Sequence, residues 1–371
     1  MQVPQWQRAV LKVGSALIAP DGQGCSGRYA LAIATFVTQC RAQGKELVLV
    51  SSGSVAAGRR CFDFPHQQLP IHVRKAMASV GQNEMMANWS RFFDFPCAQV
   101  LLTHGDLRDR TRYVSVQDTL NTLLEHGCLP IVNENDAVAT DELRVGDNDN
   151  LAAMVATVVD ADALFILSDV DGLFDRDPNS HPDAKLLPVV ERIDEQIHAM
   201  AGGTRNQIAT GGMKTKIEAA EKATSHGVDT YIFNGGNSQC LATLLAGENP
   251  GTLFRAHRDP LSNRKHWLRH TLKAQGRVLV DEGAALALIR DGASLLGSGI
   301  VEVQGDFERG DAVVICQQDQ ARPLAKGISR YSAWELAHVK GRHSDDIDHP
   351  MGAQGRSAVI HRDDMMILEA Q

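Results

Sequence analysis

Short apolar runs alternate with longer segments of helical period from about residue 8 to residue 250. The apolar runs are rich in leucine and β-branched residues and show little polar alternation, which is typical of strands buried on both faces of a parallel sheet. We predict strands at 9–13, 46–50, 97–102, 129–132, 163–167 and 229–233. The pattern therefore indicates an α/β domain in which helices cover a mainly parallel sheet.

Two of the intervening segments carry signals for the start and the end of a helix. In 26–44, Ser26 can cap the first turn, apolar residues recur at three- and four-residue intervals, and Gly44 ends the pattern. The segment 115–127 has the same arrangement, from a serine start to a glycine stop. We expect both segments to be helices that connect strands in repeated βαβ units.

The pattern changes near residue 254. The segment that follows has six Lys and Arg residues against one Asp, contains a proline and has no strand-like run, so it is expected to be a linker. Beyond it, short β-like runs separated by Gly and Asp predict a small, barrel-like β domain. The expected organisation is an α/β domain at 1–253, a linker at 254–275, a β domain at 276–355 and a C-terminal tail at 356–371.

Length and composition agree with two soluble domains. A chain of 371 residues is too long for one ordinary core, and its 43% hydrophobic and 22% charged residues are typical of a globular protein. No apolar run reaches the length of about 18 residues that suggests a membrane span. The N-terminus lacks a basic segment followed by an apolar core, so no signal peptide is predicted and the protein is expected to be cytoplasmic.

Charge and cysteine content argue against a nucleic-acid-binding protein and against a protein stabilised by zinc or disulfides. The formal net charge of -8 disfavours nucleic acid as the principal ligand, because binding to a phosphate backbone normally requires a basic face. The seven cysteines include no CxxC pair, so neither a zinc site nor a disulfide framework is predicted.

Small polar residues follow several predicted strands, at the edge where open α/β sheets bind their ligands. Lys12 lies near the end of an apolar strand, which favours a functional role, although an edge strand can also carry a lysine. Three other strands are followed by SSGSVAAG at 51–58, NENDAVAT at 133–140 and SDVDG at 168–172. Each of these segments alone can be a turn. Their recurrence at successive strand ends favours a binding site.

The segment TGGMKTKIEAAEKATSHG, at 210–227, places glycines at the start of a predicted helix and lysines just inside it, which suits a phosphate group. It is not a Walker A loop, because Met213 separates Gly212 from Lys214. Two solvated lysines are the alternative, but the helix dipole disfavours cations in a first turn. Because Lys214 and Lys216 lie about 200° apart on a helix, only one is expected to face the phosphates.

The segment RVGDNDNLAAM, at 144–154, packs two aspartates and two asparagines into four positions. Asp147 and Asp149 match the first positions of a calcium-binding EF-hand loop, but Leu151 and Ala152 do not match the next ones. The segment is therefore a capped helix start, or a substrate site that also caps a helix. A cap needs only one such residue, so four in a row favour a ligand.

These motifs, in this order, resemble those of the glutamate 5-kinases in the amino acid kinase family: LKVGSA, SSGSVAAG, IVNENDAVAT, VGDNDNLAA, LSDVDGLF and TGGMKTK. The C-terminal part, from GRVLVDEG through GISRYS, resembles the PUA domain that follows the kinase domain in bacterial members. SDVDGLF is shared with kinases of acetylglutamate, aspartate or UMP, whereas NENDAVAT with GDNDN and the appended domain is more specific. The resemblance covers almost the whole chain. It implies an amino acid kinase-like αβα sandwich with a mainly parallel central sheet, followed by a small PUA domain.

The resemblance also implies an activity. It is the ATP-dependent phosphorylation of the side-chain carboxylate of L-glutamate to γ-glutamyl phosphate, the first step of proline biosynthesis, with ATP and Mg²⁺. Feedback inhibition by proline, a functional partnership with glutamyl phosphate reductase and a homo-oligomer, either a dimer or a tetramer, are implied in the same way. No protein ligands of Mg²⁺ are assigned, since this ion typically keeps water and phosphate oxygens as ligands.

The resemblance further implies catalytic residues. Lys12 and Lys216 match the lysines that contact the phosphoryl groups, and Asp149 matches the aspartate that organises them. Lys214 stands where the family often has serine, which leaves Lys216 as the better candidate. The chemistry agrees, because glutamate is already ionised at pH 7 and needs fixed positive charge near the phosphates rather than a general base.

Binding residues are carried over in the same manner. The glutamate-binding positions of the family correspond to Ser52, Asp136 and Asn148. Two further residues, Asn133 and Asp147, are expected to lie nearby. The nucleotide-binding positions correspond to Lys12, Ser168, Asp169, Thr210, Gly211, Gly212, Met213, Lys214, Thr215 and Lys216.

Two alternatives stay open at the level of the sequence. A related amino acid kinase with a different acceptor shares part of the motif set. An RNA-binding protein is the second, since PUA-like domains often contact RNA. Residues 277–371 hold 15 Asp and Glu against 10 Lys and Arg, a net charge of -5, which disfavours contacts with phosphates.

Overall fold

The computed structural model divides the chain into two compact units, which are treated separately below. The first unit consists of Met1–Leu107 and Tyr113–His257, and the second of Arg108–Arg112 and Arg258–Gln371. The structure describes residues 3–22, 24–62, 69–139, 148–178, 180–201, 212–256, 274–318, 323–341 and 358–368.

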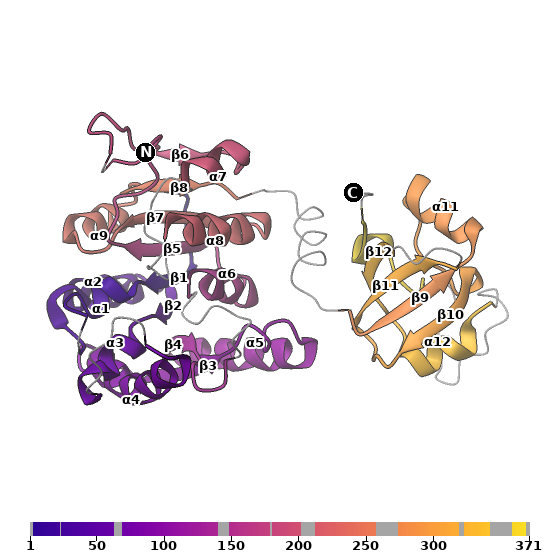
Figure 1. The fold of residues 1–371 in the computed structure, drawn as a ribbon, viewed down its shortest axis with the longest axis horizontal. Coiled ribbons are helices and arrows are strands. Elements are labelled where there is room, and N and C mark those ends of the chain that lie inside the picture. Colours follow the sequence, from indigo (N-terminus) through magenta and orange to yellow (C-terminus); the bar gives the residue numbers. More distant parts are fainter. Residues whose placement is uncertain are drawn as a thin grey trace. The chain divides into compact units, whose positions relative to one another are not determined.

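The first unit is built on an eight-stranded sheet with the order β3-β4-β2-β1-β5-β7-β8-β6 (Figure 1). Its strands are β1 (Arg8–Val13), β2 (Glu46–Ser51), β3 (Cys97–Leu102), β4 (Leu129–Glu134), β5 (Ala163–Ser168), β6 (Val189–Val190), β7 (Asp229–Asn234) and β8 (Thr252–Phe254). Neighbouring strands are parallel, except that β8 pairs with β7 in the antiparallel direction. The mainly parallel sheet expected from the sequence is confirmed.

All six strands predicted from the apolar runs are present, as β1 to β5 and β7. The sequence analysis did not predict β6 and β8, which have two and three residues. Runs this short show no period that distinguishes them from a loop. Phe254 belongs to β8, so the first sheet extends one residue into the segment that was expected to be a linker.

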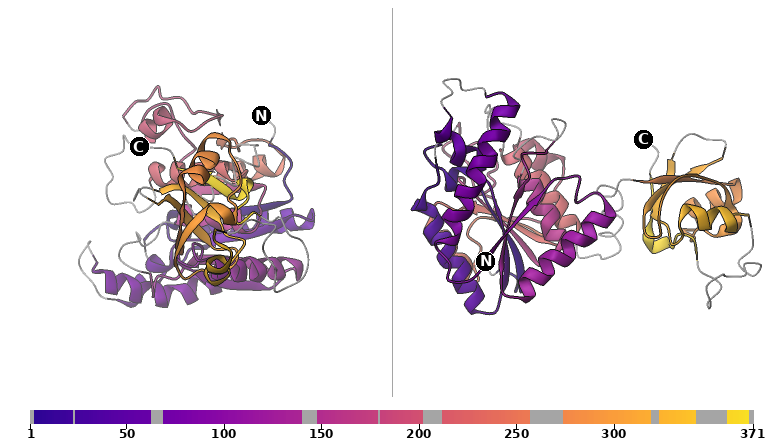
Figure 2. Two further views of the ribbon diagram at one scale, coloured as in Figure 1. Left: turned by 90° about the vertical axis from the view of Figure 1, so that its right-hand side faces the viewer. Right: turned by 90° about the horizontal axis from the view of Figure 1, so that it is seen from below.

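Helices cover both faces of this sheet, as the right-hand view of Figure 2 shows. The helical elements of the first unit are α1 (Ser15–Ile18), α2 (Gly27–Ala42), α3 (Ser54–Gly58), η1 (Arg59–Cys61), α4 (Ile71–Ser90), α5 (Arg110–Glu125), α6 (Asn148–Val158), α7 (Glu195–Ala201), α8 (Met213–Ser225) and α9 (Ser238–Leu245). Alternate residues of a strand face opposite sides. Val10 of β1 therefore packs with α5, α6 and α8, whereas Leu11 packs with α2, α4 and α9.

The predicted helix signals are correct for α2 and wrong for the start of α5. Ser26 caps α2 by accepting a hydrogen bond from the Arg28 N–H at 3.2 Å, and the chain turns after the helix through Gly44 at φ +78°. Helix α5 begins five residues before Ser115, where the Asp109 carboxylate accepts the backbone N–H of Arg112 at 3.0 Å. The capping aspartate lies before the serine, so Ser115 is inside the helix rather than at its start.

The second unit holds a five-stranded sheet with the order β10-β9-β11-β12-β13 around its own core (Figure 1). Its elements are β9 (Gly276–Val280), α11 (Glu282–Arg290), η2 (Gly297–Gly299), β10 (Ile300–Gly305), β11 (Ala312–Gln317), β12 (Pro323–Ile328), α12 (Ala333–Val339), η4 (Arg362–Asp364) and β13 (Met365–Ile367). Strand β13 pairs with β12, so residues of the expected C-terminal tail form part of this sheet. The sequence analysis did not predict α11, whose start is capped by the Asp281 carboxylate.

Among the described residues, no helix combines the length and the apolar character needed to cross a membrane.

A close contact between α3 and α4 fixes the segment that follows β2. A Cβ atom on Gly81 of α4 would lie 1.9 Å from the Ser54 carbonyl oxygen, and one on Gly58 of α3 would lie 1.9 Å from the Met77 carbonyl oxygen. No larger residue fits at either position without moving backbone. The two glycines therefore allow α4 to approach the end of β2 at backbone distance.

We expect Gly81→Ala to destabilise the protein by about 1–3 kcal/mol or more, because the added methyl group overpacks the contact between α3 and α4. Thermal unfolding of the purified variant measures this effect. Ser79→Ala is the matched control, since Ser79 lies on the same helix with an exposed side chain. Equal unfolding midpoints for the two variants would contradict the close contact.

Candidate active site

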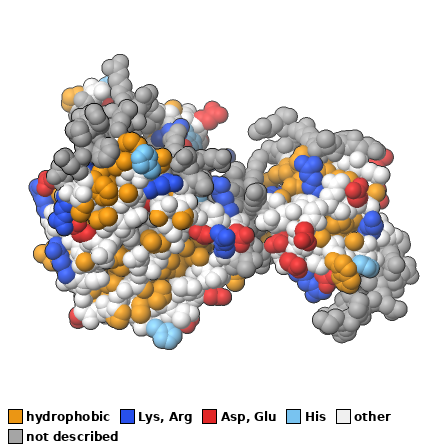
Figure 3. All heavy atoms as spheres, turned by 60° about the horizontal axis from the view of Figure 1, so that its bottom comes forward, with side chains coloured by type: hydrophobic (Ala, Val, Ile, Leu, Met, Phe, Trp, Pro, Cys, Tyr) orange, Lys and Arg blue, Asp and Glu red, His pale blue; other side chains and the backbone are white. Residues whose placement is uncertain are grey.

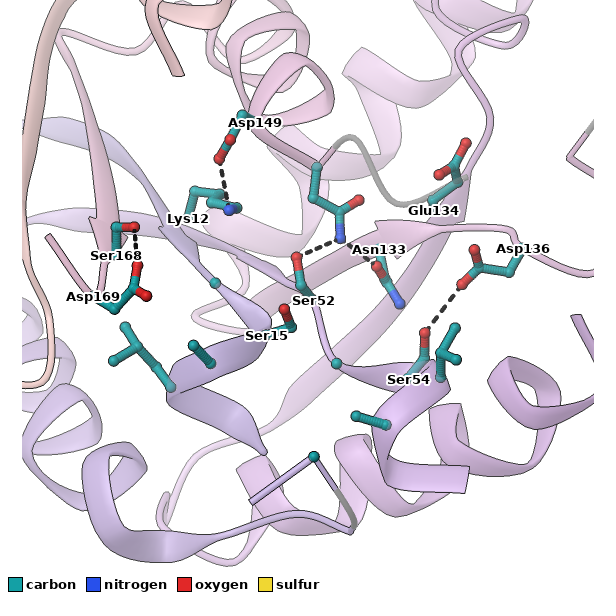
Figure 4. A pocket seen from close by; sticks show the side chains of 18 of the residues that line it. Lys12, Ser15, Ser52, Ser54, Asn133, Glu134, Asp136, Asp149, Ser168 and Asp169 are labelled. Carbon is teal, nitrogen blue, oxygen red and sulfur yellow. Dashed lines mark hydrogen bonds and ion pairs between the residues drawn. The ribbon is translucent and has the colours of Figure 1, made fainter. Parts of the chain in front are cut away.

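A cavity of about 400 Å³ lies at the carboxyl ends of four adjacent strands, β4, β2, β1 and β5. These strands are parallel, so the segments that follow them meet at one edge of the sheet. This explains why motifs separated by more than 100 residues in the sequence line one cavity (Figure 4).

A group of three buried charges forms one wall of the cavity. The Lys12 ammonium, at the end of β1, lies 2.6 Å from Asp149 Oδ1, and the Lys216 ammonium of α8 lies 3.2 Å from Asp149 Oδ2. The Thr215 hydroxyl also donates to Asp149 Oδ2, at 2.9 Å. Each of the three charged residues is at most 5% exposed, so the charges are held in one geometry by protein rather than by water.

Mutual attraction sets the ionisation of this group. Burial acts to raise the pKa of Asp149, but the Lys12 and Lys216 ammonium groups outweigh burial and hold this pKa well below its usual range. Burial lowers the pKa of Lys216, and Asp149 opposes that shift. With both lysines protonated, the group has a net charge of one positive beside the cavity. Such a site is suited to an anion.

A network of amides and hydroxyls forms the next part of the wall. Asn148 Nδ2, in the first turn of α6, donates to Ser52 Oγ at 2.9 Å and to Asn133 Oδ1 at 2.8 Å. Asn133, at the end of β4, is 1% exposed. These side chains come from two strand ends and one helix start, and they supply hydrogen-bond donors and acceptors without charge.

A carboxylate lies at the far end of the cavity from Ser168 and Asp169, as Figure 4 shows. The Ser54 hydroxyl donates to Asp136 Oδ2 at 3.0 Å. Burial raises the pKa of Asp136 to about 6; the bond from Ser54 opposes this shift and the neighbouring Glu134 adds to it. A carboxylate that is costly to ionise and faces a cavity is suited to a cationic group of a ligand.

A second cavity, of about 280 Å³, adjoins the first. It is lined by Ala16, Leu17, Tyr29, Asp169, Asn234, Gly236 and Asn237. Three of these residues line both cavities: Ala16, Leu17 and Asp169. Asp169 also accepts a hydrogen bond from the Ser168 hydroxyl at 3.0 Å. A ligand can therefore extend from one cavity into the other past Asp169.

The structure brings most of the predicted site residues together. Those that line the larger cavity are Lys12, Ser52, Asn133, Asp136, Asn148, Asp149, Ser168, Asp169 and Lys216. Three predicted residues, Asp147, Thr210 and Gly211, lie outside the described residues.

The start of α8 separates its two lysines as the helical spacing predicts. The side chain of Lys216 is buried against Asp149, whereas that of Lys214 is exposed. Gly212 is the N-cap residue, Met213 packs against the core, and Thr215 contacts Asp149. Only one of the two lysines lines the cavity, which confirms the geometric part of the prediction.

The sequence analysis did not name several residues that line the cavities. In the larger cavity, Ser15, Ser54 and Glu134 lie within segments that it singled out, whereas Arg59 and Arg74 lie outside them. In the smaller cavity, the residues that it did not name include Asn234, Gly236 and Asn237, which follow β7. The strand-end rule could have found this last group, because the polar run NGGN directly follows a predicted strand. Arg74 lies inside helix α4, where no local signal distinguishes it from a surface residue.

The described residues include no group of three or more His, Cys, Asp and Glu side chains that could hold a metal ion. Mg²⁺ does not require such a group, since it binds through one or two carboxylates and keeps waters and substrate phosphates as ligands. Asp169, which faces both cavities, is a suitable carboxylate for an ion of this kind.

Known proteins are similar to this chain over both of its domains. Residues 7–234 match the model of the amino acid kinase family, and residues 276–351 match that of the PUA domain. A glutamate 5-kinase of Idiomarina loihiensis is 65% identical over the full length of both chains. Glutamate 5-kinase 1 of Pseudoalteromonas translucida is 54% identical, over 93% of this chain and 94% of that protein. A glutamate 5-kinase of Salinibacter ruber is 53% identical, over 98% of both chains.

The chain therefore belongs to the amino acid kinase family and, within it, to the glutamate 5-kinases, with a PUA domain after its kinase domain.

Proposed function

We propose that this protein transfers the γ-phosphoryl group of ATP to the side-chain carboxylate of L-glutamate, giving γ-glutamyl phosphate, the first step of proline biosynthesis. The observation that carries the proposal is the division of one cavity into two ends. One end holds two buried lysines on a single aspartate, and the other holds a buried carboxylate. L-Glutamate has complementary charges: its negative side-chain carboxylate matches the lysine end, and its positive ammonium group matches the end that holds the buried carboxylate.

The lysine end supports phosphoryl transfer. The substrate carboxylate is already ionised at neutral pH, so an oxygen of this group attacks the γ-phosphorus without a general base. The bond between this phosphorus and the bridging oxygen of ADP breaks, and ADP leaves. Lys12 and Lys216 offset the repulsion between the two anions and stabilise the charge on the transferring group. Asp149 holds both ammonium groups in place.

The opposite end supports recognition of the amino acid. Asp136 accepts hydrogen bonds from the substrate ammonium, and Ser52, Asn133 and Asn148 form the polar wall between Asp136 and the lysines. Asp147 is proposed to act nearby. A buried carboxylate discriminates against ligands that lack a cation, because Asp136 would then have the Ser54 hydroxyl but no positive charge to offset its burial.

The smaller cavity supports binding of the nucleotide. Ser168, Asp169 and the residues at the start of α8, Thr210 to Lys216, are proposed to contact ATP, whose phosphates then reach Lys12. Backbone N–H groups at a helix start favour phosphate oxygens. Bound Mg²⁺ neutralises phosphate charge, and Asp169 is the residue proposed to hold it.

Family membership supports further proposals about regulation and assembly. Proline is proposed as a feedback inhibitor, glutamyl phosphate reductase as the functional partner that consumes the product, and a homo-oligomer as the assembled form. The PUA domain is proposed to be structural or regulatory rather than a site for RNA. Figure 3 shows Asp and Glu side chains beside Lys and Arg on the visible described face of this unit, which does not favour a phosphate backbone.

Hydroxylamine trapping tests the reaction itself. With L-glutamate and MgATP, we expect a glutamyl hydroxamate to form, because hydroxylamine attacks acyl phosphates. Omission of L-glutamate is the control, and equal signal in both reactions would overturn the proposal. Release of ADP measured with N-acetylglutamate, aspartate and UMP tests the related acceptors, and a higher kcat/KM on any of them would assign the chain a different substrate.

Lys216→Ala is expected to lower kcat at least about 100-fold, because its charge matters most while the phosphoryl group transfers. The KM for L-glutamate should change less than about threefold, since this lysine lies at the phosphate end. Steady-state kinetics with saturating ATP measure both values. Lys214→Ala is the matched control on the same helix turn. The Lys214 side chain is exposed and does not line the cavity, so its loss should leave kcat at saturating ATP within about threefold of the wild type, whatever it does to the KM for ATP. A variant with a raised KM and an unchanged kcat would contradict the role given to Lys216.

Acidification should weaken glutamate binding through Asp136. This carboxyl has a pKa of about 6, so it is ionised above that pH and neutral below it, and only the ionised form attracts the substrate ammonium. We expect kcat/KM for L-glutamate to fall about tenfold for each pH unit below the pKa. Asp136→Asn should have a low kcat/KM that no longer changes across this range. Parallel profiles for the wild type and the variant would exclude Asp136 as the titrating group.

A further inference from the structure

A chain of three buried amides connects helix α4 to the cavity. The Gln82 side chain of α4 accepts at Oε1 a hydrogen bond from Asn133 Nδ2, at 2.8 Å. Asn133 Oδ1 in turn accepts from Asn148 Nδ2, also at 2.8 Å. All three residues are at most 8% exposed, so water does not replace these bonds. Gln82 does not line the cavity, whereas the other two residues do.

The direction of these hydrogen bonds is fixed at the end of β2. Asn148 Nδ2 lies 3.5 Å from the Ser51 carbonyl oxygen, which can only accept, and 2.9 Å from the Ser52 hydroxyl. The amide nitrogen of Asn148 must therefore point toward Ser51 and Ser52. Because this nitrogen also contacts Asn133, Asn133 must present its side-chain oxygen as the acceptor. Asn133 can present its oxygen only if its nitrogen finds an acceptor on the other side. Gln82 supplies that acceptor.

This arrangement leaves an atom at each end of the three-amide chain without a partner among the described residues, the donor Gln82 Nε2 and the acceptor Asn148 Oδ1. Asn148 Oδ1 is buried and accepts no hydrogen bond within the described part of the chain. A buried acceptor is satisfied only by a donor. Of the groups on an amino acid with an acidic side chain, the ammonium donates hydrogen bonds, whereas ionised carboxylates only accept them.

We infer that Gln82 is a positioning residue for substrate recognition: through Asn133 it holds Asn148 with Oδ1 available to the ammonium group of the substrate. The inference rests on the proposed function, since it concerns the same cavity. It gives Asn148 a defined task, the recognition of a cation, and assigns selectivity for an amino acid over a simple dicarboxylate to a residue outside the cavity.

The fold explains how a helix residue reaches this position. Gln82 directly follows Gly81, whose missing side chain lets α4 approach the Ser54 carbonyl. The close approach of α4 carries the Gln82 side chain to the end of β4, where Asn133 lies. The same backbone contact therefore supports both the β2 end and the β4 end of the cavity.

Gln82→Met tests the inference, because methionine has a similar volume and lacks the amide acceptor. We expect the KM for L-glutamate to rise about tenfold, as for the loss of one hydrogen bond to a charged group, with kcat within about threefold of the wild type. Glutarate is L-glutamate without its amino group. Its inhibition constant, measured in competition with L-glutamate, should change less than about twofold, since it has no ammonium for Asn148 to recognise.

Asn88→Leu is the matched control. Asn88 lies on the same helix and is 5% exposed, and neither amide atom has a hydrogen-bond partner among the described residues. This variant also removes a buried amide from α4, and it should leave both constants unchanged. Thermal unfolding of both variants verifies that they are folded. If Gln82→Met does not fold, Gln82→Ala is measured instead, with the same expectation.

The possible outcomes separate the two proposals. If the wild type forms no glutamate-dependent product, the proposed function fails. If the wild type is active and the constants of Gln82→Met equal those of Asn88→Leu, only the positioning role of Gln82 fails. Equal weakening of L-glutamate and glutarate binding would also overturn that role, because a general distortion of the cavity does not distinguish a ligand with an ammonium from one without.

Discussion

The buried ion group of Lys12, Asp149 and Lys216 is the interaction on which the site depends. Each charge would be costly to bury alone. Here both ammonium groups pair with Asp149, that of Lys12 at 2.6 Å and that of Lys216 at 3.2 Å. The three residues come from β1, α6 and α8, so the group also fixes the relative positions of these elements. The excess of one positive charge in this group suits this end of the cavity to an anion and supports phosphoryl transfer as the proposed chemistry.

The strand order gives this charged group its counterpart. Because β4, β2, β1 and β5 are adjacent and parallel, the segments after them form one continuous wall. Positive charge lies at the β1 end, neutral amides lie beside it, and the Asp136 carboxylate lies near α3. The glycine contact between α3 and α4 supports the amide part from behind. In the proposed function, chemistry and recognition thus occupy different strand ends of the same sheet.

Much of the fold could be predicted because buried parallel strands have a strong local signal. Their apolar runs identified β1 to β5 and β7, and the polar residues after them identified most of the cavity wall. Elements without such a signal were missed, as with the short strands β6, β8 and β13. Arg74, which lines the cavity, and Gln82, which lies behind it, were also missed. Both lie on helix α4, where polar residues are common and only tertiary contacts show what these particular ones contact.

The sequence by itself determined most of the segments that line the cavity and the chemical groups they carry, since strand ends and helix starts can be recognised locally. It also determined that Lys214 and Lys216 cannot face the same side, because the helical period separates them. Only the tertiary structure decided which of the two is buried, because that depends on where Asp149 lies across the sheet. The direction of the amide chain was decided in the same way, since an amide's orientation depends on the partners at both of its ends.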